Sequence, residues 1–381
     1  MSEAKQSCQK PTLYQKRRNI IYDWMAREGI SLALIEDTED RRDANLRWLS
    51  GMPGDALLFL SVDRRAVLVP WDINLARLYA DAEYLKPYSD FDRQPVHACV
   101  KTAELLKLPP NARIELPPVT PYPLFLRYVE ALTRFDAICR DSAGLAAELE
   151  TLRAIKDDDE IKMYRKAGAI TDDIARLVEK FLRGGKIKTE FDAALFIEAE
   201  CRRRGCEGAG FEILAAGPAR SFAIHAFPAS TAESFGTRGL SILDFGVNYR
   251  GYRSDVTITV ACSPTKPQER MIALVEKARR QVLAKLKAGV SNVEAAAWAE
   301  AVFSRARKSM PHALGHGIGL DAHEAPVLRL RGPERIIEKN MILAVEPGLY
   351  NPLLGGCRLE NDYLITEDGA EPLTHTGIIY R

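Results

Sequence analysis

The sequence predicts a two-domain protein, with a smaller α/β domain over residues 1–150 and a larger α+β domain over residues 151–381. The length of 381 residues exceeds what one hydrophobic core normally serves. Near residue 150, short apolar runs give way to long segments with helical periodicity. A composition of 46% hydrophobic and 28% charged residues is ordinary for a globular chain. We therefore expect a domain boundary between residues 145 and 155.

The first domain alternates between one helix-like and several strand-like segments. Residues 12–28 carry apolar side chains among lysines and arginines, which predicts an amphipathic helix. Short apolar runs follow at residues 32–35, 56–60 and 66–69, each bounded by turn residues or charges. This alternation is typical of an α/β unit that packs by itself.

Helices and strands of the second domain have readable starts. An apolar face over residues 161–181 follows the acidic run 157–160, which suits the N-terminus of a helix because the helix dipole favours negative charge there. A proline opens the segment 267–288 as a first-turn residue, and Ser291 begins a capping box before 292–307. Four strand-like segments mix β-branched residues with an acidic side chain: Ser241–Gly246, Tyr252–Val260, Met341–Glu346 and Arg358–Thr366.

Charge and composition exclude several classes of function. Lysine plus arginine total 53 against 52 aspartate plus glutamate, so the net charge of +1 gives no pull toward nucleic acid or anionic membrane. No apolar run approaches the roughly 18 residues of a membrane span, and the first 19 residues have no apolar core of a signal peptide. The 7 cysteines form no CxxC pair, which favours a reducing, cytoplasmic compartment.

Two aspartates flank a turn-like segment in the middle of the second domain. A hairpin centred between Tyr249 and Arg250 would place Asp244 directly opposite Asp255. Cross-strand β-carbons lie roughly 5 Å apart, a spacing at which two carboxylates between apolar strands repel each other. Either one carboxylate holds a proton, or both reach solvent, or a cation lies between them.

Histidines and glutamates gather in the last third of the chain. Of the 6 histidines, four are His225, His312, His316 and His323, inside or near the glycine-rich PHALGHGIGLDAHEAP. Those glycines would let the backbone pack closely around the imidazoles, or would simply make a tight loop.

Glu346 ends an apolar strand in AVEPG, and Glu360 follows a glycine-rich turn in GGCRLENDY. If these two glutamates converge with the two aspartates and one neutral histidine, two divalent cations would balance the four negative charges. Oxygen-rich ligation with one imidazole suits manganese, iron or cobalt at least as well as zinc.

Four segments in this order, ILDFGVNYRGYRSDVT, HALGHGIGLDAHEAP, AVEPGLY and GGCRLENDY, resemble the motifs of the metallopeptidase family with the pita-bread fold. Methionine aminopeptidase, aminopeptidase P, prolidase and creatinase belong to that family. The resemblance covers about residues 150–381 and implies a pita-bread catalytic domain there. The additional domain over residues 1–150 resembles the α/β N-terminal domain of the prolidase, aminopeptidase P and creatinase branch.

The resemblance also implies roles for individual residues. The positions that match the metal ligands of the family are Asp244, Asp255, His316, Glu346 and Glu360. Within that set, Asp255 and Glu360 match the residues that bridge both metals. The positions that match catalytic residues are His225, His323 and Glu346, and those that match residues lining the substrate cleft are His312, Tyr350 and Arg358.

From these roles we expect hydrolysis of the Xaa-Pro bond in dipeptides or short peptides, as in Xaa-Pro dipeptidase or Xaa-Pro aminopeptidase. The cofactors would be two divalent ions, manganese first, with cobalt, iron and zinc as alternatives. A hydroxide between the ions would attack the carbonyl, Glu346 would take the proton, and His225 with His323 would bind the carbonyl oxygen. The resemblance further implies a homodimer.

Two other functions stay open from the sequence. One is metal-dependent hydrolysis of a small non-peptide amide or cyclic amidine, resembling ectoine hydrolase. The other is a non-catalytic binding module, which the complete ligand set disfavours. One departure from the family pattern is Ile258, where threonine, arginine, threonine is often found after the aspartate. The ligand set does not depend on that position, but the salt bridge that the arginine would make, and any substrate preference or subunit contact that rests on it, does not carry over from the resemblance.

Overall fold

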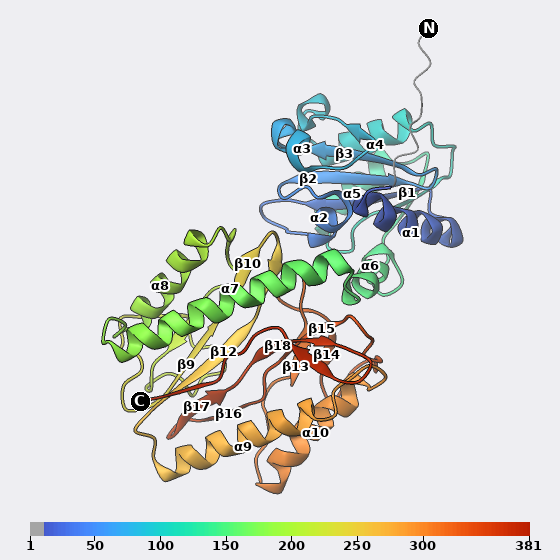
Figure 1. Cartoon of the computed structure of the whole chain (residues 1–381). Coiled ribbons are helices and arrows are strands. Elements are labelled where there is room, and N and C mark those ends of the chain that lie inside the picture. Colours follow the sequence, from blue (N-terminus) through green and yellow to red (C-terminus); the bar gives the residue numbers. More distant parts are fainter. Residues whose placement is uncertain (1–10) are drawn as a thin grey trace. The chain divides into compact units, whose positions relative to one another are not determined.

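The computed structural model describes residues 11–381, and Figure 1 shows its helices and strands. The first ten residues, with Cys8 and the beginning of the segment in which we expected no signal peptide, lie outside the described part. The chain divides into two compact units, Met1–Leu149 and Glu150–Arg381. The division falls inside a helix, α6 (Leu145–Ala154).

The first unit is built on a mixed six-stranded sheet with strand order β4-β3-β2-β1-β5-β6. The strands are β1 (Leu32–Asp37), β2 (Ala56–Ser61), β3 (Arg65–Pro70), β4 (Tyr84–Leu85), β5 (Arg113–Glu115) and β6 (Asp136–Ile138). The helices are α1 (Leu13–Glu28), α2 (Ala44–Ser50), α3 (Ile73–Tyr79), α4 (Pro95–Leu105) and α5 (Tyr122–Ala131), with a short 3-10 turn η1 (Tyr88–Phe91). Every residue of β1 and β2 is buried, so both faces of the central sheet are covered.

Two local signals bound the first helix of this unit. Helix α1 begins after Thr12, whose side chain accepts a hydrogen bond from the backbone N–H of Gln15 in a capping box. It ends at Gly29, which has a φ of 68° that glycine adopts without strain. The predicted helix over 12–28 and the three predicted strands are confirmed.

Four long helices frame the second unit: α7 (Asp158–Arg183), α8 (Glu190–Arg203), α9 (Lys266–Leu283) and α10 (Asn292–Arg305). Asp157 caps α7 in a capping box with Glu160, which confirms the acidic helix start. Ser291 accepts a hydrogen bond from the backbone N–H of Glu294 at the start of α10. The expectation of a helix to residue 288 was wrong, because α9 ends at Leu283 and Gly289 turns the chain with a φ of 91°.

The strands of the second unit form two larger and two smaller sheets, and the unit is α+β as predicted. The larger sheets have the strand orders β20-β12-β9-β8 and β14-β13-β15-β18-β19. Their strands are β8 (Leu214–Ala216), β9 (Gly239–Phe245), β12 (Val256–Cys262), β13 (Gly315–Gly317), β14 (Glu324–Leu328), β15 (Ile342–Val345), β18 (Asn361–Ile365), β19 (Ala370–Pro372) and β20 (Ile378–Tyr380). The smaller sheets hold β7 (Gly208–Ala209), β10 (Val247–Tyr249), β11 (Tyr252–Arg253), β16 (Gly348–Asn351) and β17 (Gly355–Arg358).

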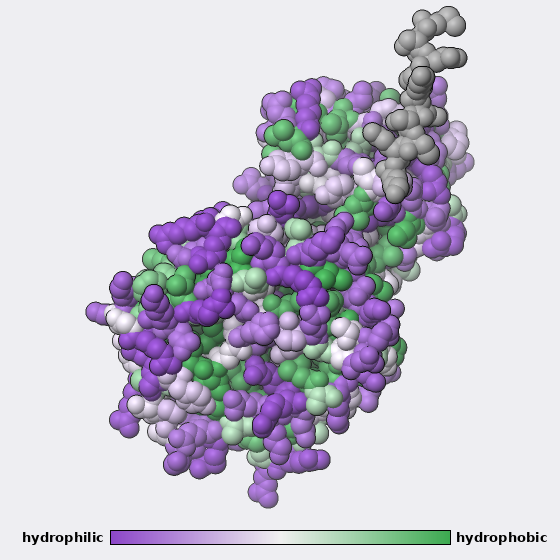
Figure 2. All heavy atoms as spheres, viewed as in Figure 1, coloured by the Kyte–Doolittle hydropathy of each residue, from purple (hydrophilic) through white to green (hydrophobic). Residues whose placement is uncertain are grey.

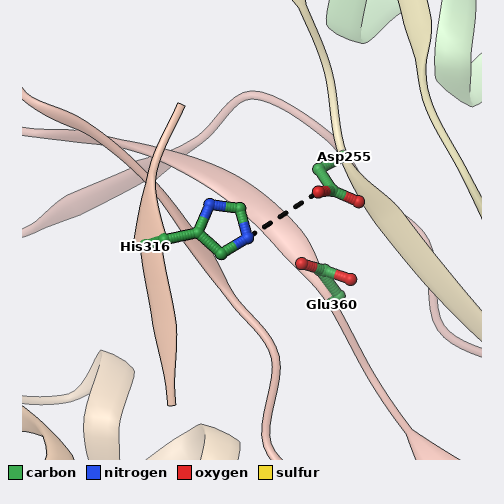
Figure 3. Close-up of side chains that lie close together, drawn as sticks. All are labelled: Asp255, His316 and Glu360. Atoms are coloured by element: carbon green, nitrogen blue, oxygen red, sulfur yellow. Dashed lines mark ion pairs between the residues drawn. The ribbon is translucent and has the colours of Figure 1, made fainter. Parts of the chain in front are cut away.

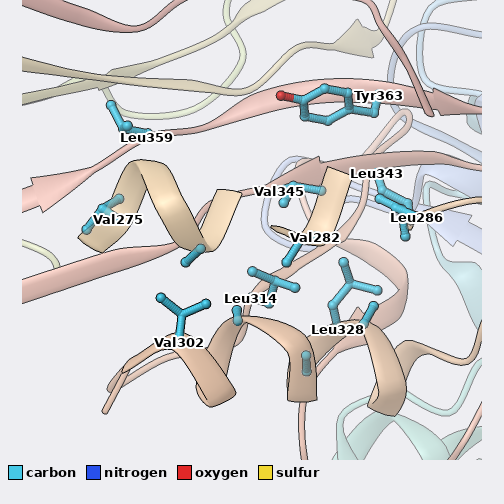
Figure 4. Packing of buried hydrophobic residues seen from close by; sticks show 14 of the residues in the cluster. Val275, Val282, Leu286, Val302, Leu314, Leu328, Leu343, Val345, Leu359 and Tyr363 are labelled. Atoms are coloured by element: carbon cyan, nitrogen blue, oxygen red, sulfur yellow. The ribbon is translucent and has the colours of Figure 1, made fainter. Parts of the chain in front are cut away.

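Helices cover the strands of this unit on two sides (Figure 1). On one side, apolar residues of α7 and α8 pack against β9 and β12. On the other, Val275 and Val282 of α9 and Val302 of α10 pack in one cluster with Leu343 and Val345 of β15 (Figure 4). The strands between these two cores are therefore fixed on both faces, which gives a rigid support for side chains at their ends.

The central hairpin differs from the predicted register. Asp244 lies opposite Thr257 and not opposite Asp255. The cause is the turn, because Arg250 and Gly251 both have positive φ, 53° and 88°, as the two central residues of a type I′ turn require. The turn is therefore centred one residue later than expected, and the pairing moves by two residues.

Two predicted strands are also interrupted. The segment 252–260 is broken at Ser254 and Asp255 between β11 and β12, and the segment 358–366 is divided between β17 and β18. In both cases the break contains a carboxylate of the site, Asp255 or Glu360.

The face shown in Figure 2 mixes hydrophilic and apolar side chains. None of the helices within residues 11–381 has the length and apolar character of a membrane span.

Candidate active site

A pocket of about 520 Å³ in the second unit gathers the residues that the sequence singled out. Its wall includes His225, Asp244, Asp255, His312, His316, His323, Glu346, Arg358 and Glu360. Tyr350 lies behind that wall, where its hydroxyl contacts Arg358 and His312. Segments separated by more than a hundred residues thus bring all of the predicted site residues to one place.

The hairpin explains how the two aspartates reach one face despite the corrected register. Residues two apart along a strand share a face, so Asp255 lies on the same side as Thr257. Thr257 is directly opposite Asp244, and cross-strand partners also share a face. Because the register moved by two residues and not by one, Asp244 and Asp255 remain neighbours on the diagonal.

Asp255, His316 and Glu360 form a buried group whose potential ligand atoms all lie within 4.8 Å of one another. His316 Nε2 is 3.8 Å from Asp255 Oδ2 and 3.8 Å from Glu346 Oε1. Figure 3 shows the imidazole on its own strand, with the two carboxylates facing it from other segments. His316 Nδ1 donates to the carbonyl oxygen of Gly317 at 2.9 Å, and that tautomer leaves Nε2 with a lone pair toward the acids.

The glycines beside His316 are required by close strand packing. A β-carbon on Gly315 would lie 2.0 Å from the carbonyl oxygen of Ala344, and one on Gly317 would lie 2.1 Å from that of Ala325. These oxygens belong to β15 and β14, the strands on either side of β13. Of the two interpretations of the glycine-rich stretch, close backbone packing around the imidazole is confirmed.

Burial disfavours the charged forms of three carboxyl groups of the site. Burial, followed by repulsion from neighbouring carboxylates, raises the pKa of Asp255 and of Glu360 well above their ordinary values. Burial raises the pKa of Glu346 to about 8, although Arg358 opposes the shift. Burial also lowers the pKa of His316 to about 4, so this imidazole is neutral near pH 7. Cations would relieve the repulsion among the acids and accept the lone pair of the neutral imidazole.

The residues present fit divalent metal ions. Asp244 Oδ1 and Asp255 Oδ1 are buried without a hydrogen-bond partner, although buried carboxylate oxygens normally have one. A ligand set of four carboxylates and one imidazole suits hard or borderline divalent cations. The five residues that would hold them are Asp244, Asp255, His316, Glu346 and Glu360.

Arg358 connects two carboxylates of the site to the side chains around them. Its guanidinium, 1% exposed, donates from Nη2 to Asp244 Oδ2 at 2.5 Å and from Nε to Thr257 Oγ1 at 2.9 Å. Thr257 Oγ1 in turn donates to Glu360 Oε2 at 2.7 Å. The Nη1 group donates to Tyr350 Oη at 2.8 Å and to the carbonyl oxygen of Ile224 at 3.0 Å. Arg358 therefore orients two of the acids, in addition to forming part of the pocket wall.

The three other histidines of the pocket wall differ in how far the protein itself occupies their ring nitrogens. His312 donates from Nδ1 to the carbonyl oxygen of Ala313 at 2.8 Å, and its Nε2 lies 3.0 Å from Tyr350 Oη. Both ring nitrogens of His312 are thus occupied by the protein. His225 and His323 are exposed on the pocket wall, and the ring of His323 lies 4.2 Å from that of His316 between centroids. The last two are placed to meet a substrate.

An ion cluster that the sequence did not reveal supports the loop carrying His323. Glu324 Oε2 lies 3.0 Å from Lys156 Nζ, Glu324 Oε1 contacts the Arg153 guanidinium, and Arg153 also pairs with Asp321 at 2.8 Å. We call these four residues the Glu324 clamp. Each cation lies 168 or more residues before the acid with which it pairs, so no local pattern could have indicated the pairing. Thr257 was also missed, although its position two residues after Asp255 places it on the same face.

Comparisons with known proteins agree with this geometry. The model of metallopeptidase family M24 matches residues 162–367. An uncharacterized peptidase, YqhT, of Bacillus subtilis is 34% identical over 247 residues, which are 64% of this chain and 69% of the relative. A Xaa-Pro dipeptidase of Pyrococcus furiosus is 32% identical over 60% of this chain and 65% of the relative. These alignments span about two thirds of the curated relatives.

Solved structures extend the likeness over nearly the whole chain. An X-Pro aminopeptidase from Thermotoga maritima superposes with a TM-score of 0.83 at 25% identity, covering 96% of this chain and 99% of that structure. A Xaa-Pro dipeptidase from Bacillus anthracis gives a TM-score of 0.82 at 25% identity, covering 97% and 99%. The predicted pita-bread fold with its additional N-terminal domain is confirmed.

Proposed function

Because the chain belongs to metallopeptidase family M24, we propose that it hydrolyses the bond between an N-terminal residue and a following proline in short peptides. The observation that carries this proposal is the convergence of four carboxylates and one neutral imidazole, with two carboxylate oxygens left unpartnered, on one wall of an open pocket. The names of similar proteins, Xaa-Pro dipeptidase and X-Pro aminopeptidase, support the choice of bond.

Two divalent ions held by Asp244, Asp255, His316, Glu346 and Glu360 would supply a water that ionises near neutral pH and a Lewis acid for the substrate carbonyl. Manganese is the first choice, with cobalt, iron and zinc as alternatives, because four of the five ligands offer oxygen. Arg358 and Thr257 would keep Asp244 and Glu360 oriented while the ions are bound.

Side chains of the pocket would carry the proton and the developing charge. Glu346 reaches the pocket with 18% of its side chain exposed. It would accept the proton of the attacking water and pass it to the leaving proline nitrogen. His225 and His323 would donate hydrogen bonds to the carbonyl oxygen as negative charge develops there.

Proline recognition would come from the apolar part of the wall. Phe211, Leu214 and Ile224 line the pocket near the acids. A pyrrolidine ring has no N–H to satisfy once the Xaa-Pro bond is formed, so an apolar surface can accept it without loss of a hydrogen bond.

The proposal includes a homodimer and a cytoplasmic location, and the free state of all six cysteines among residues 11–381 supports the cytoplasmic location.

A substrate panel tests the proposal. Protein loaded with manganese, cobalt or zinc is offered Ala-Pro-Ala, Ala-Ala-Ala and a cyclic amidine of the ectoine type. We expect release of alanine from Ala-Pro-Ala, with kcat/KM at least about 10-fold above that for Ala-Ala-Ala. Equal rates on the two tripeptides would remove the proline-specific claim. Turnover of the cyclic amidine alone would favour the small-amide hydrolase.

A further inference from the structure

Resting on the proposed function, we infer that the site is built for peptides that continue beyond the proline, and that it discriminates against free Xaa-Pro dipeptides. The reason is electrostatic. A dipeptide ends in a carboxylate on the proline Cα, and that Cα is bonded directly to the nitrogen of the cleaved bond. That charge must enter the pocket together with the reacting atoms, whereas a longer peptide places a neutral amide there.

The pocket is rich in negative charge and has a single permanent cation. Among the described residues that line it, five carry carboxylates, namely Glu212, Asp244, Asp255, Glu346 and Glu360, and Arg358 alone carries a guanidinium. Two divalent ions would balance four of the carboxylates, and Arg358 would balance the fifth. A substrate carboxylate would then be a surplus negative charge in a partly enclosed space, where an unpaired charge is costly.

Arg358 cannot serve as the partner of that carboxylate without breaking the site. Its guanidinium is 1% exposed and donates to Asp244, Thr257, Tyr350 and the carbonyl oxygen of Ile224. Turning toward a substrate would leave Asp244 and Tyr350 buried without this donor, and a buried polar group that loses its partner costs about 1–3 kcal/mol.

An uncharged part of the pocket wall lies beside the metal-ligand position His316. Val327 of β14 lies opposite His316 of β13, and cross-strand partners share a face, so its side chain points into the same pocket. It is 36% exposed, and Phe227, another residue that lines the pocket, is 96% exposed. Both residues suit the neutral backbone or apolar side chain of a longer peptide, and neither can pair with a carboxylate.

The test compares Ala-Pro, Ala-Pro-amide and Ala-Pro-Ala on the same manganese-loaded protein at pH 8, where ordinary histidines are uncharged. Ala-Pro-amide has the size of the dipeptide without its terminal charge, so it separates charge from length. We expect kcat/KM for the amide and for the tripeptide to exceed that for Ala-Pro by at least about 10-fold. Equal values for Ala-Pro and its amide would overturn the inference while leaving the proposed function intact. Hydrolysis of none of the three would contradict the proposed function and the inference with it.

A charge-placement pair sharpens the test. Val327→Arg puts a guanidinium on the pocket wall, and Val327→Gln adds a polar chain without charge. We expect the ratio of kcat/KM for Ala-Pro to that for Ala-Pro-amide to rise about 10-fold in Val327→Arg and to stay unchanged in Val327→Gln. Binding of the product proline against prolinamide, measured by calorimetry, should shift in the same direction without any turnover. An equal rise for both substrates in Val327→Arg would show that charge is not the cause.

Discussion

Arg358 Nη2 donates a 2.5 Å hydrogen bond to Asp244 Oδ2, and both side chains belong to the wall of the same pocket. The pair joins Asp244 to the side chains around the site, because Arg358 also donates hydrogen bonds to Thr257 and Tyr350. The contribution of Arg358 is thus geometric as well as electrostatic.

Replacing Arg358 should therefore impair metal binding and catalysis together. Arg358→Lys keeps one positive charge but cannot donate to Asp244, Thr257 and Tyr350 at once, since the planar fork is lost. We expect manganese affinity and kcat each to fall by about 10- to 100-fold. Titration of the metal-free protein with manganese measures the first and steady-state kinetics the second. Wild-type values for both in Arg358→Lys would show that charge alone is needed.

His323 should be needed for turnover but not for metal. Its ring lies 4.2 Å from that of His316 between centroids, at an interplanar angle of 49°, and is exposed on the pocket wall. In His323→Ala we expect both metals to remain bound while kcat falls by about 100-fold or more, as for the loss of a donor to the developing oxyanion. His316→Ala is the matched control and should lose metal. If elemental analysis shows that His323→Ala has also lost a metal, the two histidines are assigned wrongly.

The Glu324 clamp should stabilise the second unit in a pH-dependent way. Burial raises the pKa of Glu324, but the ion pairs with Lys156 and Arg153 outweigh it and lower the pKa to about 2. A carboxylate with a depressed folded-state pKa contributes stability that is complete above its unfolded pKa of about 4.5 and is lost as pH falls toward 2. Glu324→Gln leaves two buried cations underpaired, so we expect a loss of about 3–5 kcal/mol at pH 7 and a weaker acid dependence.

Glu371→Gln is the control for this experiment. Glu371 pairs with Arg165 on the surface, with 41% of its side chain exposed. Exposed pairs contribute about 0–1 kcal/mol, so the variant should unfold almost as the wild type does in urea. Equal destabilisation by the two substitutions would refute the special role of the buried clamp.

Gly315 should not tolerate alanine. A β-carbon there would lie 2.0 Å from the carbonyl oxygen of Ala344, so strand β13 would have to move away from β15 and carry His316 with it. We expect Gly315→Ala to unfold at lower urea concentration and to bind manganese more weakly. At Gly369 an added β-carbon meets nothing within 4 Å, so Gly369→Ala should behave as the wild type in both assays. Wild-type metal binding by Gly315→Ala would contradict this account.

Sequence reasoning reached the elements and the site residues because their signals are local. The acidic start of α7 and the apolar runs of β1 to β3 are readable within a few residues. The hairpin register was missed although Gly251 offers a signal, because the observed centre lets a glycine adopt one of the two positive φ angles, whereas the expected centre would need Tyr249 to adopt it. The acids still came out on one face because either centre preserves the alternation.

The sequence could not reveal the side chains that hold the metal ligands and the His323 loop in place. The role of Arg358 depends on partners at 244 and 257, and the Glu324 clamp joins segments 168 residues apart. Such contacts follow from the packing of sheets and helices, and charge pattern along the chain does not encode them. The motif resemblance placed Arg358 in the cleft, and the structure adds that its donors are occupied by the protein.

Metal stoichiometry measured alongside activity tests the central claim most directly. Protein stripped with a chelator is titrated with manganese while bound metal is determined by elemental analysis and Ala-Pro-Ala hydrolysis is recorded. The arrangement of Asp244, Asp255, His316, Glu346 and Glu360 predicts about two ions per chain, no turnover without them, and activity that rises as they bind. Full turnover by a preparation shown to contain no metal would contradict it.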